Sequence, residues 1–193
     1  FPDLQSQITA ADVEALLNDP GYSAFGNFCS VYQYYHMMSS GKLRYTNKVV
    51  GPVRLKQKQS FYINTLLIDE AMQSAMSSYQ LDLSEFDSKK EGLVDAVSFM
   101  YAGRTQYNGE LWPHNYVHEM RFGDVKTRYY TLQSLGRNNL DLSIGTFSHE
   151  SGHMLCRFPD LYDYGERDDD LEESSGLGYY CLMSAGNHLG NGK

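Results

Sequence analysis

The sequence predicts an α/β or α+β fold, with helices and strands mixed along the chain. Apolar residues recur at helical spacing in three places, at 13–17, 31–38 and 60–79. Residues 93–102 form a largely apolar run of strand length instead. The length of 193 residues suits one domain, and 41% apolar with 21% charged residues excludes intrinsic disorder. We therefore expect a single domain over residues 1–193.

Capping signals define the first two helices. Thr9 and Asp12 match a capping box ahead of an apolar face, and the Asn-Asp-Pro-Gly sequence at 18–21 stops this helix. The Ser-x-x-Gln sequence at 30–33 marks a second helix start, and Gly41 ends that run. Two short helices are therefore expected before residue 42.

The sequence in the middle of the chain predicts both strands and a helix. Residues 43–55 have the composition of two short strands joined by a turn at Gly51-Pro52. A long helix is expected over residues 60–79. Its predicted inner side consists of Ile63, Leu66, Leu67, Met72, Ala75 and Met76.

Two further strands and an irregular segment complete the pattern. Residues 93–102 read as a buried strand that ends at Gly103, and residues 129–135 are a second strand candidate. Residues 159–178 are rich in Asp, Glu, Gly and Ser, which predicts an irregular surface segment.

The net charge of the chain disfavours some classes of binding partner. Sixteen basic and 24 acidic residues give a net charge of −8, which argues against nucleic acid or an anionic membrane as a partner. No apolar run approaches the roughly 18 residues of a membrane-spanning helix. The first twenty residues lack the basic start and apolar stretch of a signal peptide.

The sequence His149-Glu150-Ser-Gly-His153 carries the clearest chemistry. Histidines four residues apart lie on one face of a helix, where both imidazoles can grip one metal ion. Glu150 projects from the same side and can take a proton from a water on that metal without being a ligand. Two neutral imidazoles with an open position suit zinc.

A zinc site needs a third protein ligand. Pro159 ends the helix and forces a turn, which can swing Asp160 or Asp163 back toward the metal. Glu172 and Glu173 are the rival candidates, since a glutamate at this spacing suits a plan with a second ligand-bearing helix. We favour Asp160, with Asp163 as its nearest competitor.

Three segments of the chain belong together. They are His149-Glu150-x-Gly152-His153-x-Leu155, Phe158-Pro159-Asp160-Leu161-Tyr162-Asp163 and Leu182-Met183-Ser184-x-Gly186. In combination they resemble the immune inhibitor A family of secreted bacterial zinc metallopeptidases, which is metzincin-like. Weaker similarity extends upstream in the family's order, through Phe1-Pro2-Asp3, Ser30-Val31, Phe86-Asp87 and Trp112-Pro113-His114. Asp160 follows His153 by seven residues, where the family's aspartate follows by six, and Cys156 stands where the family has glycine.

The resemblance implies a zincin-type catalytic domain. Such a domain has a twisted sheet, a zinc-binding active-site helix and a methionine turn, here at Met183. Relative to the family, both ends of the chain look clipped. The implied activity is zinc-dependent endopeptidase hydrolysis of a secreted enzyme on protein or peptide substrates. Its site consists of His149, His153 and Asp160 as metal ligands and Glu150 as general base.

Alternatives and lesser features stay open at this point. A catalytically silent binding module braced by zinc is the main rival, and a metal-free interaction domain is the next. Calcium is a minor candidate at residues 87–95 and at the acidic run 168–173. A second zinc site at His114 and His118 is a further minor candidate. Oxyanion donors near the methionine turn are His188, Tyr179 or Tyr180.

The three cysteines exclude a dense disulfide framework. We expect a disulfide between Cys156 and Cys181, because they flank the zinc helix and the methionine turn and could tie these segments together. Cys29 is expected to remain separate.

Overall fold

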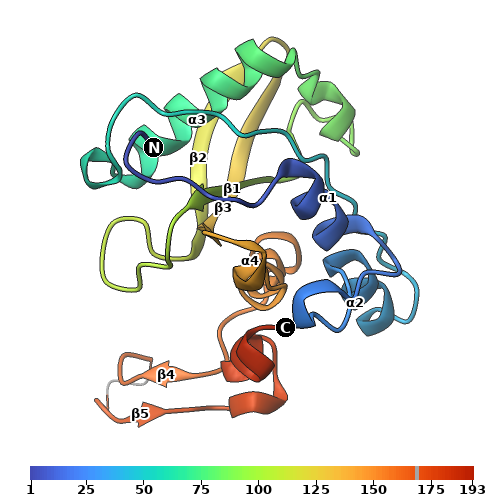
Figure 1. Cartoon of the computed structure of the whole chain (residues 1–193). Helices are drawn as coiled ribbons and strands as arrows, with labels where there is room; N and C mark the ends of the chain where they lie inside the picture. Colours follow the sequence, from blue (N-terminus) through green and yellow to red (C-terminus); the bar gives the residue numbers. More distant parts are fainter. Residues whose placement is uncertain (168–169) are drawn as a thin grey trace. The chain divides into compact units, whose positions relative to one another are not determined.

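The computed structural model describes residues 1–167 and 170–193. The chain is a mixture of helices and a small mixed sheet, which confirms the α+β class (Figure 1). It divides into two compact units. The first unit contains Phe1–Glu14 and Asn47–Asp141, and the second contains Ala15–Thr46 and Leu142–Lys193. A single domain over residues 1–193 remains a prediction.

The first unit is built on a three-stranded sheet in the order β1-β3-β2. β1 (Val97–Ala102) runs parallel to β3 (Val125–Gly136), and β2 (His114–Phe122) runs antiparallel to it. The predicted strands at 93–102 and 129–135 are confirmed in β1 and β3. β2 was not predicted, because polar and charged residues interrupt its apolar ones and much of it faces solvent.

Helix α3 (Asn64–Tyr79) lies alongside this sheet (Figure 1). Its buried residues pack with Tyr101, Tyr130 and Leu132 of β1 and β3. The predicted inner side is partly wrong, since Ile63 and Leu66 are exposed. The helix begins four residues later than predicted, after the short 3-10 helix η2 (Gln59–Phe61). The buried face consists of Leu67, Ile68, Ala71, Met72 and Ala75, so the prediction is right for Leu67, Met72 and Ala75.

The two strands predicted within 43–55 are wrong, because no strand occupies these residues. Some backbone amides in and near this segment donate hydrogen bonds to side chains, and not to a neighbouring strand. The Val49 amide donates to the Glu14 carboxylate at 3.0 Å. Just beyond, the Lys56 amide donates to the Glu70 carboxylate at 2.6 Å. Short 3-10 turns, η3 (Leu83–Phe86) and η4 (Asn139–Asp141), complete the first unit.

Both N-terminal caps are confirmed. Helix α1 (Ala10–Asn18) begins at the reciprocal capping box of Thr9 and Asp12, with the Thr9 amide donating to the Asp12 carboxylate at 2.8 Å. Helix α2 (Val31–Met38) begins at Ser30, whose hydroxyl oxygen accepts from the Gln33 amide. A 3-10 turn, η1 (Ala24–Gly26), lies between them.

The second unit is organised around helix α4 (Gly145–Cys156), most of which is buried. After α4 the described residues are mostly irregular, as predicted. They include the short pair β4 (Asp163–Tyr164) and β5 (Glu173–Ser174), then η5 (Gly178–Tyr180) and η6 (Ala185–Asn191). No helix in the described part of the chain is long and apolar enough to cross a membrane.

Candidate metal centre

Helix α4 carries three of the four predicted site residues. His149 and Glu150 are buried, and His153 is half-buried. Ser143 has a side chain suited to an N-cap, but Ile144 occupies the cap position of α4 and makes no side-chain cap. The C-terminal segment holds this helix end instead. The Gly145 amide donates to the Gly192 carbonyl at 2.9 Å, and a Cβ on Gly145 would collide with the backbone of Asn187.

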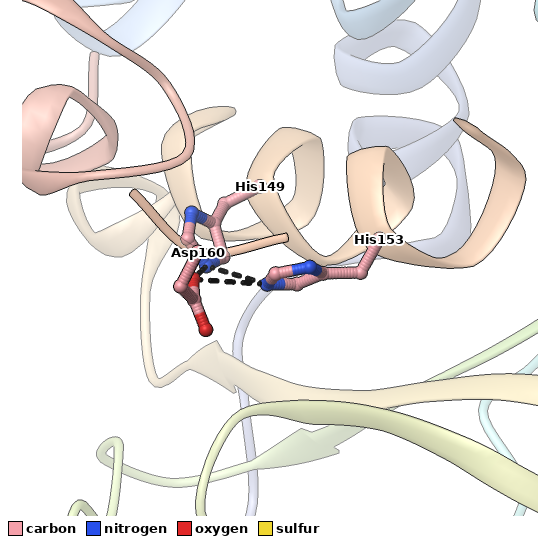
Figure 2. Close-up of side chains that lie close together, drawn as sticks. All are labelled: His149, His153 and Asp160. Carbon is pink, nitrogen blue, oxygen red and sulfur yellow. Dashed lines mark hydrogen bonds and ion pairs between the residues drawn. The ribbon is translucent and has the colours of Figure 1, made fainter. Parts of the chain in front are cut away.

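The fourth predicted residue, Asp160, meets both histidines (Figure 2). Asp160 Oδ1 lies 3.1 Å from His149 Nε2 and 3.1 Å from His153 Nε2. The two Nε2 atoms are 3.1 Å apart. Three potential ligand atoms therefore form a nearly equilateral triangle.

Two backbone carbonyls orient the imidazoles. His149 Nδ1 lies 2.8 Å from the Leu182 carbonyl oxygen, and His153 Nδ1 lies 2.6 Å from that of Phe158. A carbonyl oxygen only accepts, so each neutral ring carries its proton on Nδ1 and leaves Nε2 as a lone pair. Both lone pairs belong to the atoms that face Asp160. This is the tautomer that a metal ligand requires.

The end of α4 brings Asp160 back to the helix. Arg157 adopts the left-handed conformation (φ 58°, ψ 29°), and its amide donates to the carbonyls of Gly152 and His153. The chain reverses there, and Pro159 prevents any continuation of the helix. This turn accommodates the longer spacing between His153 and Asp160.

The rival ligands lie elsewhere. Asp163 Oδ1 accepts from three backbone amides, those of Gly165, Glu166 and Arg167. Glu172 and Glu173 are exposed, and Glu173 belongs to β5. Within residues 1–167 and 170–193, the triad of His149, His153 and Asp160 is the one group placed to hold a metal.

Met183 packs beneath the turn of α4 that separates the two histidines. Its side chain is buried, and a Cβ on Gly152 would lie 2.8 Å from Met183 Sδ. The Met183 carbonyl also accepts from the Leu161 amide at 2.7 Å, next to Asp160. The methionine segment therefore supports the helix and the aspartate together.

The charges of the triad reinforce one another. Burial lowers the pKa of the His149 and His153 imidazoles. Asp160, the backbone carbonyls of Leu182 and Phe158, and Glu150 together more than offset this, so both pKa values are raised above the ordinary value. The negative charge of Glu150 acts on both rings in the same direction. Burial alone would raise the pKa of the Asp160 carboxyl, but the two histidines hold it well below its usual value.

The donor set fits a divalent metal ion. Asp160 Oδ1 is buried and has no hydrogen-bond donor among the described residues. Since both Nε2 atoms are lone pairs in the neutral rings, three electron-rich atoms converge on one point. Atoms about 2.0 Å from a tetrahedral zinc ion are about 3.3 Å apart, close to the observed 3.1 Å. The triad can therefore hold a metal ion.

The other histidine pair does not form a second centre. His114 Nδ1 lies 2.6 Å from the Trp112 carbonyl oxygen, and its Nε2 lies 3.1 Å from the Tyr130 hydroxyl. His118 pairs with Asp69 at 2.7 Å. Both rings are thus committed to different partners.

The minor calcium candidates gain no support. The Asp87 carboxylate accepts from the amides of Glu91 and Gly92, and Asp95 accepts from Ser88. In the acidic run, Asp168 and Asp169 lie outside the described residues. Of the proposed oxyanion donors, Tyr179 is largely exposed, and the Tyr180 side chain is 100% exposed.

The predicted disulfide is wrong, because all three cysteines are free thiols. Burial raises the pKa of the Cys29 and Cys156 thiols.

Sequence reasoning missed the support behind α4. The Tyr35 hydroxyl donates to the Ser148 carbonyl at 2.5 Å, and the Tyr45 hydroxyl lies 3.3 Å from that of Ser151. The Tyr45 ring stacks on Phe147 with centroids 6.2 Å apart. The chain has 16 tyrosines, but this abundance does not single out these two positions.

The comparisons with known proteins identify no relative. No family model matches the chain, nor does any curated protein or solved structure.

Proposed function

We propose that this protein is a zinc-dependent endopeptidase of the immune inhibitor A type, with a zincin-type catalytic fold. The observation that carries the proposal is the triangle of His149, His153 and Asp160 with Glu150 beside it on α4. The sequence motifs around the triad support the same assignment. Secretion and a protein or peptide substrate belong to the proposal.

The donor set favours zinc. Two imidazole nitrogens and one carboxylate oxygen suit this borderline-soft ion. The described residues supply three ligands, and catalytic zinc sites keep the fourth position for water or substrate. When bound, zinc supplies Lewis acidity, which lowers the pKa of a water molecule and polarises a carbonyl.

Glu150 is the general base in this proposal. It follows His149 directly, its side chain is buried, and its charge acts on both imidazoles. The Glu150 carboxylate would accept a proton from the attacking water and deliver it to the nitrogen of the departing amine. His149, His153 and Asp160 keep their positions throughout, because carbonyls and the Met183 segment hold them.

The test compares Glu150→Gln with His153→Ala. Glu150→Gln keeps the size of the side chain but removes the base, so hydrolysis of a casein-type substrate should fall on the order of 10²–10⁴-fold. Its zinc content should stay close to one per chain, since the three ligands are untouched. His153→Ala should lose zinc and activity together. Near-normal hydrolysis by zinc-loaded Glu150→Gln would remove Glu150 as the base.

The alternative is a catalytically silent module braced by zinc. Under that alternative the wild-type chain binds zinc stoichiometrically and hydrolyses no substrate. A structural site is usually closed by four protein ligands, whereas the described residues gather three. The buried Glu150 also has no evident use in a structural site.

A further inference from the structure

Asp160 reaches the imidazoles from a segment without regular secondary structure. A ligand in such a segment needs contacts that fix its backbone. One contact is the bond from the Leu161 amide to the Met183 carbonyl at 2.7 Å. On the other side, Arg167 Nη1 donates to the backbone carbonyl of Asp160 itself.

Asp163 folds the chain so that Arg167 can make this bond. Its Oδ1 accepts from the amides of Gly165 at 2.8 Å, Glu166 at 3.1 Å and Arg167 at 3.3 Å. Three amides on one oxygen close a compact turn over residues 163–167. The Arg167 side chain then extends back over the peptide of Asp160.

Arginine is suited to this task. Its guanidinium is always charged and planar, and hydrogen bonds from an ionised donor are stronger than neutral ones. The bond ends on a main-chain carbonyl, so it leaves the Asp160 carboxylate available to face His149 and His153.

We propose that Arg167 is a positioning residue that fixes Asp160 for metal binding, and that the Asp163 turn holds Arg167 in place. The inference rests on the metal-binding part of the proposed function and needs no peptidase activity. Neither Arg167 nor Asp163 is a ligand in this arrangement. Both act through the backbone of Asp160.

The first test measures zinc affinity of the whole chain by competition with a chelator. Arg167→Ala should weaken zinc binding roughly 10–100-fold, as expected for loss of an outer-shell partner. Arg167→Lys should lie between that variant and the wild type, because lysine keeps the charge but not the planar fork. Arg44→Ala, which removes another exposed arginine of the second unit, is the control and should bind as the wild type does.

Cobalt substitution separates positioning from a general effect on folding. The visible spectrum of bound cobalt reports its ligands and geometry, so Arg167→Ala should alter this spectrum. The thermal unfolding of the metal-free variant should match that of the wild type. If Arg167→Ala fails to fold, Arg167→Lys carries the same comparison.

Asp163→Ala provides an independent route to the same result. This variant should also weaken zinc binding. The double variant Asp163→Ala/Arg167→Ala should bind zinc only slightly less tightly than the weaker-binding of the two single variants, because both substitutions act on one contact. Wild-type zinc affinity and an unchanged cobalt spectrum in Arg167→Ala would overturn the proposal. A wild-type chain that binds zinc but hydrolyses nothing would remove the peptidase and leave this inference standing. A wild-type chain that binds no zinc would remove both.

Discussion

His149 and His153 stand edge to face, with ring centroids 4.6 Å apart and ring planes at 87°. This arrangement directs both Nε2 atoms to one point, where Asp160 Oδ1 lies 3.1 Å from each. A helix fixes the spacing of the two rings, but the aspartate comes from a turn that the helix does not control. The assignment of Asp160 as a ligand is therefore the part of the site that substitutions can test most directly.

Asp160→Ala should abolish high-affinity zinc binding, whereas Glu173→Ala should not change it. The first variant removes one of three ligand atoms, and the second removes an exposed carboxylate of β5. The loss in Asp160→Ala should exceed the roughly 10–100-fold effect of an outer-shell substitution. Zinc titration against a chelator measures both. The aspartate assignment fails if Glu173→Ala strips the metal and Asp160→Ala retains it.

Zinc affinity should fall as the pH is lowered, and the fall should begin above pH 6.5. Zinc requires neutral imidazoles. In the metal-free protein Asp160, the carbonyls beside each ring and Glu150 together raise the pKa of His149 and His153 above the ordinary 6.5, although burial opposes them. Protons therefore compete with zinc at a higher pH than for isolated histidines. Calorimetry in buffers of different ionisation enthalpy should show proton release on zinc binding. Constant affinity from about pH 6 to pH 8 would contradict this account.

Gly152→Ala should destabilise the protein, although alanine favours a helix by about 1 kcal/mol. The new Cβ would lie 2.8 Å from Met183 Sδ, and overpacking of this kind costs about 1–3 kcal/mol. Zinc affinity should fall too, since Leu182 next to Met183 orients His149. Gly21→Ala, whose Cβ would meet only ordinary contacts, is the control.

The steric cause can be checked by a second substitution. Met183→Ala in the Gly152→Ala background should recover part of the stability lost through the collision, so the two effects should not add. Thermal unfolding of the wild type, the two single variants and the double variant measures this coupling. A Gly152→Ala protein more stable than the wild type would show that Met183 does not press on α4.

The features predicted correctly from sequence are those fixed over a few residues. Helix geometry places His149 and His153 on one face, and Pro159 with the turn before it returns Asp160 to that face. The capping box of Thr9 and Asp12 and the cap at Ser30 are equally local. These signals need no knowledge of the rest of the fold.

The features missed depend on contacts distant in sequence. The carbonyls of Leu182 and Phe158 orient the imidazoles, but a backbone carbonyl leaves no mark in a sequence. Residues 43–55 have strand composition yet find no partner strand, while the polar β2 finds one in β3. The expected bond between Cys156 and Cys181 was likewise a distant contact, inferred from the placement of each cysteine near the site.

His114 should make the first unit less stable in acid. His114 is buried between the Trp112 carbonyl and the Tyr130 hydroxyl, and burial lowers the pKa of its imidazole below the ordinary 6.5. In the interval between the folded and unfolded pKa values, the unfolded chain binds more protons. The stabilising contribution of His114 is therefore complete above pH 6.5, and it is lost as the pH falls through the pKa of His114 in the folded state.

His114→Phe isolates this contribution, because phenylalanine retains a buried ring and cannot titrate. The variant should be less stable than the wild type at neutral pH, since Trp112 and Tyr130 lose a partner worth about 1 kcal/mol each. Its free energy of unfolding should nevertheless decline less steeply between about pH 6.5 and pH 4 than that of the wild type. Urea denaturation at a series of pH values measures the two slopes, and subtracting them cancels the groups that both proteins share. Equal slopes would mean that His114 does not contribute to acid sensitivity.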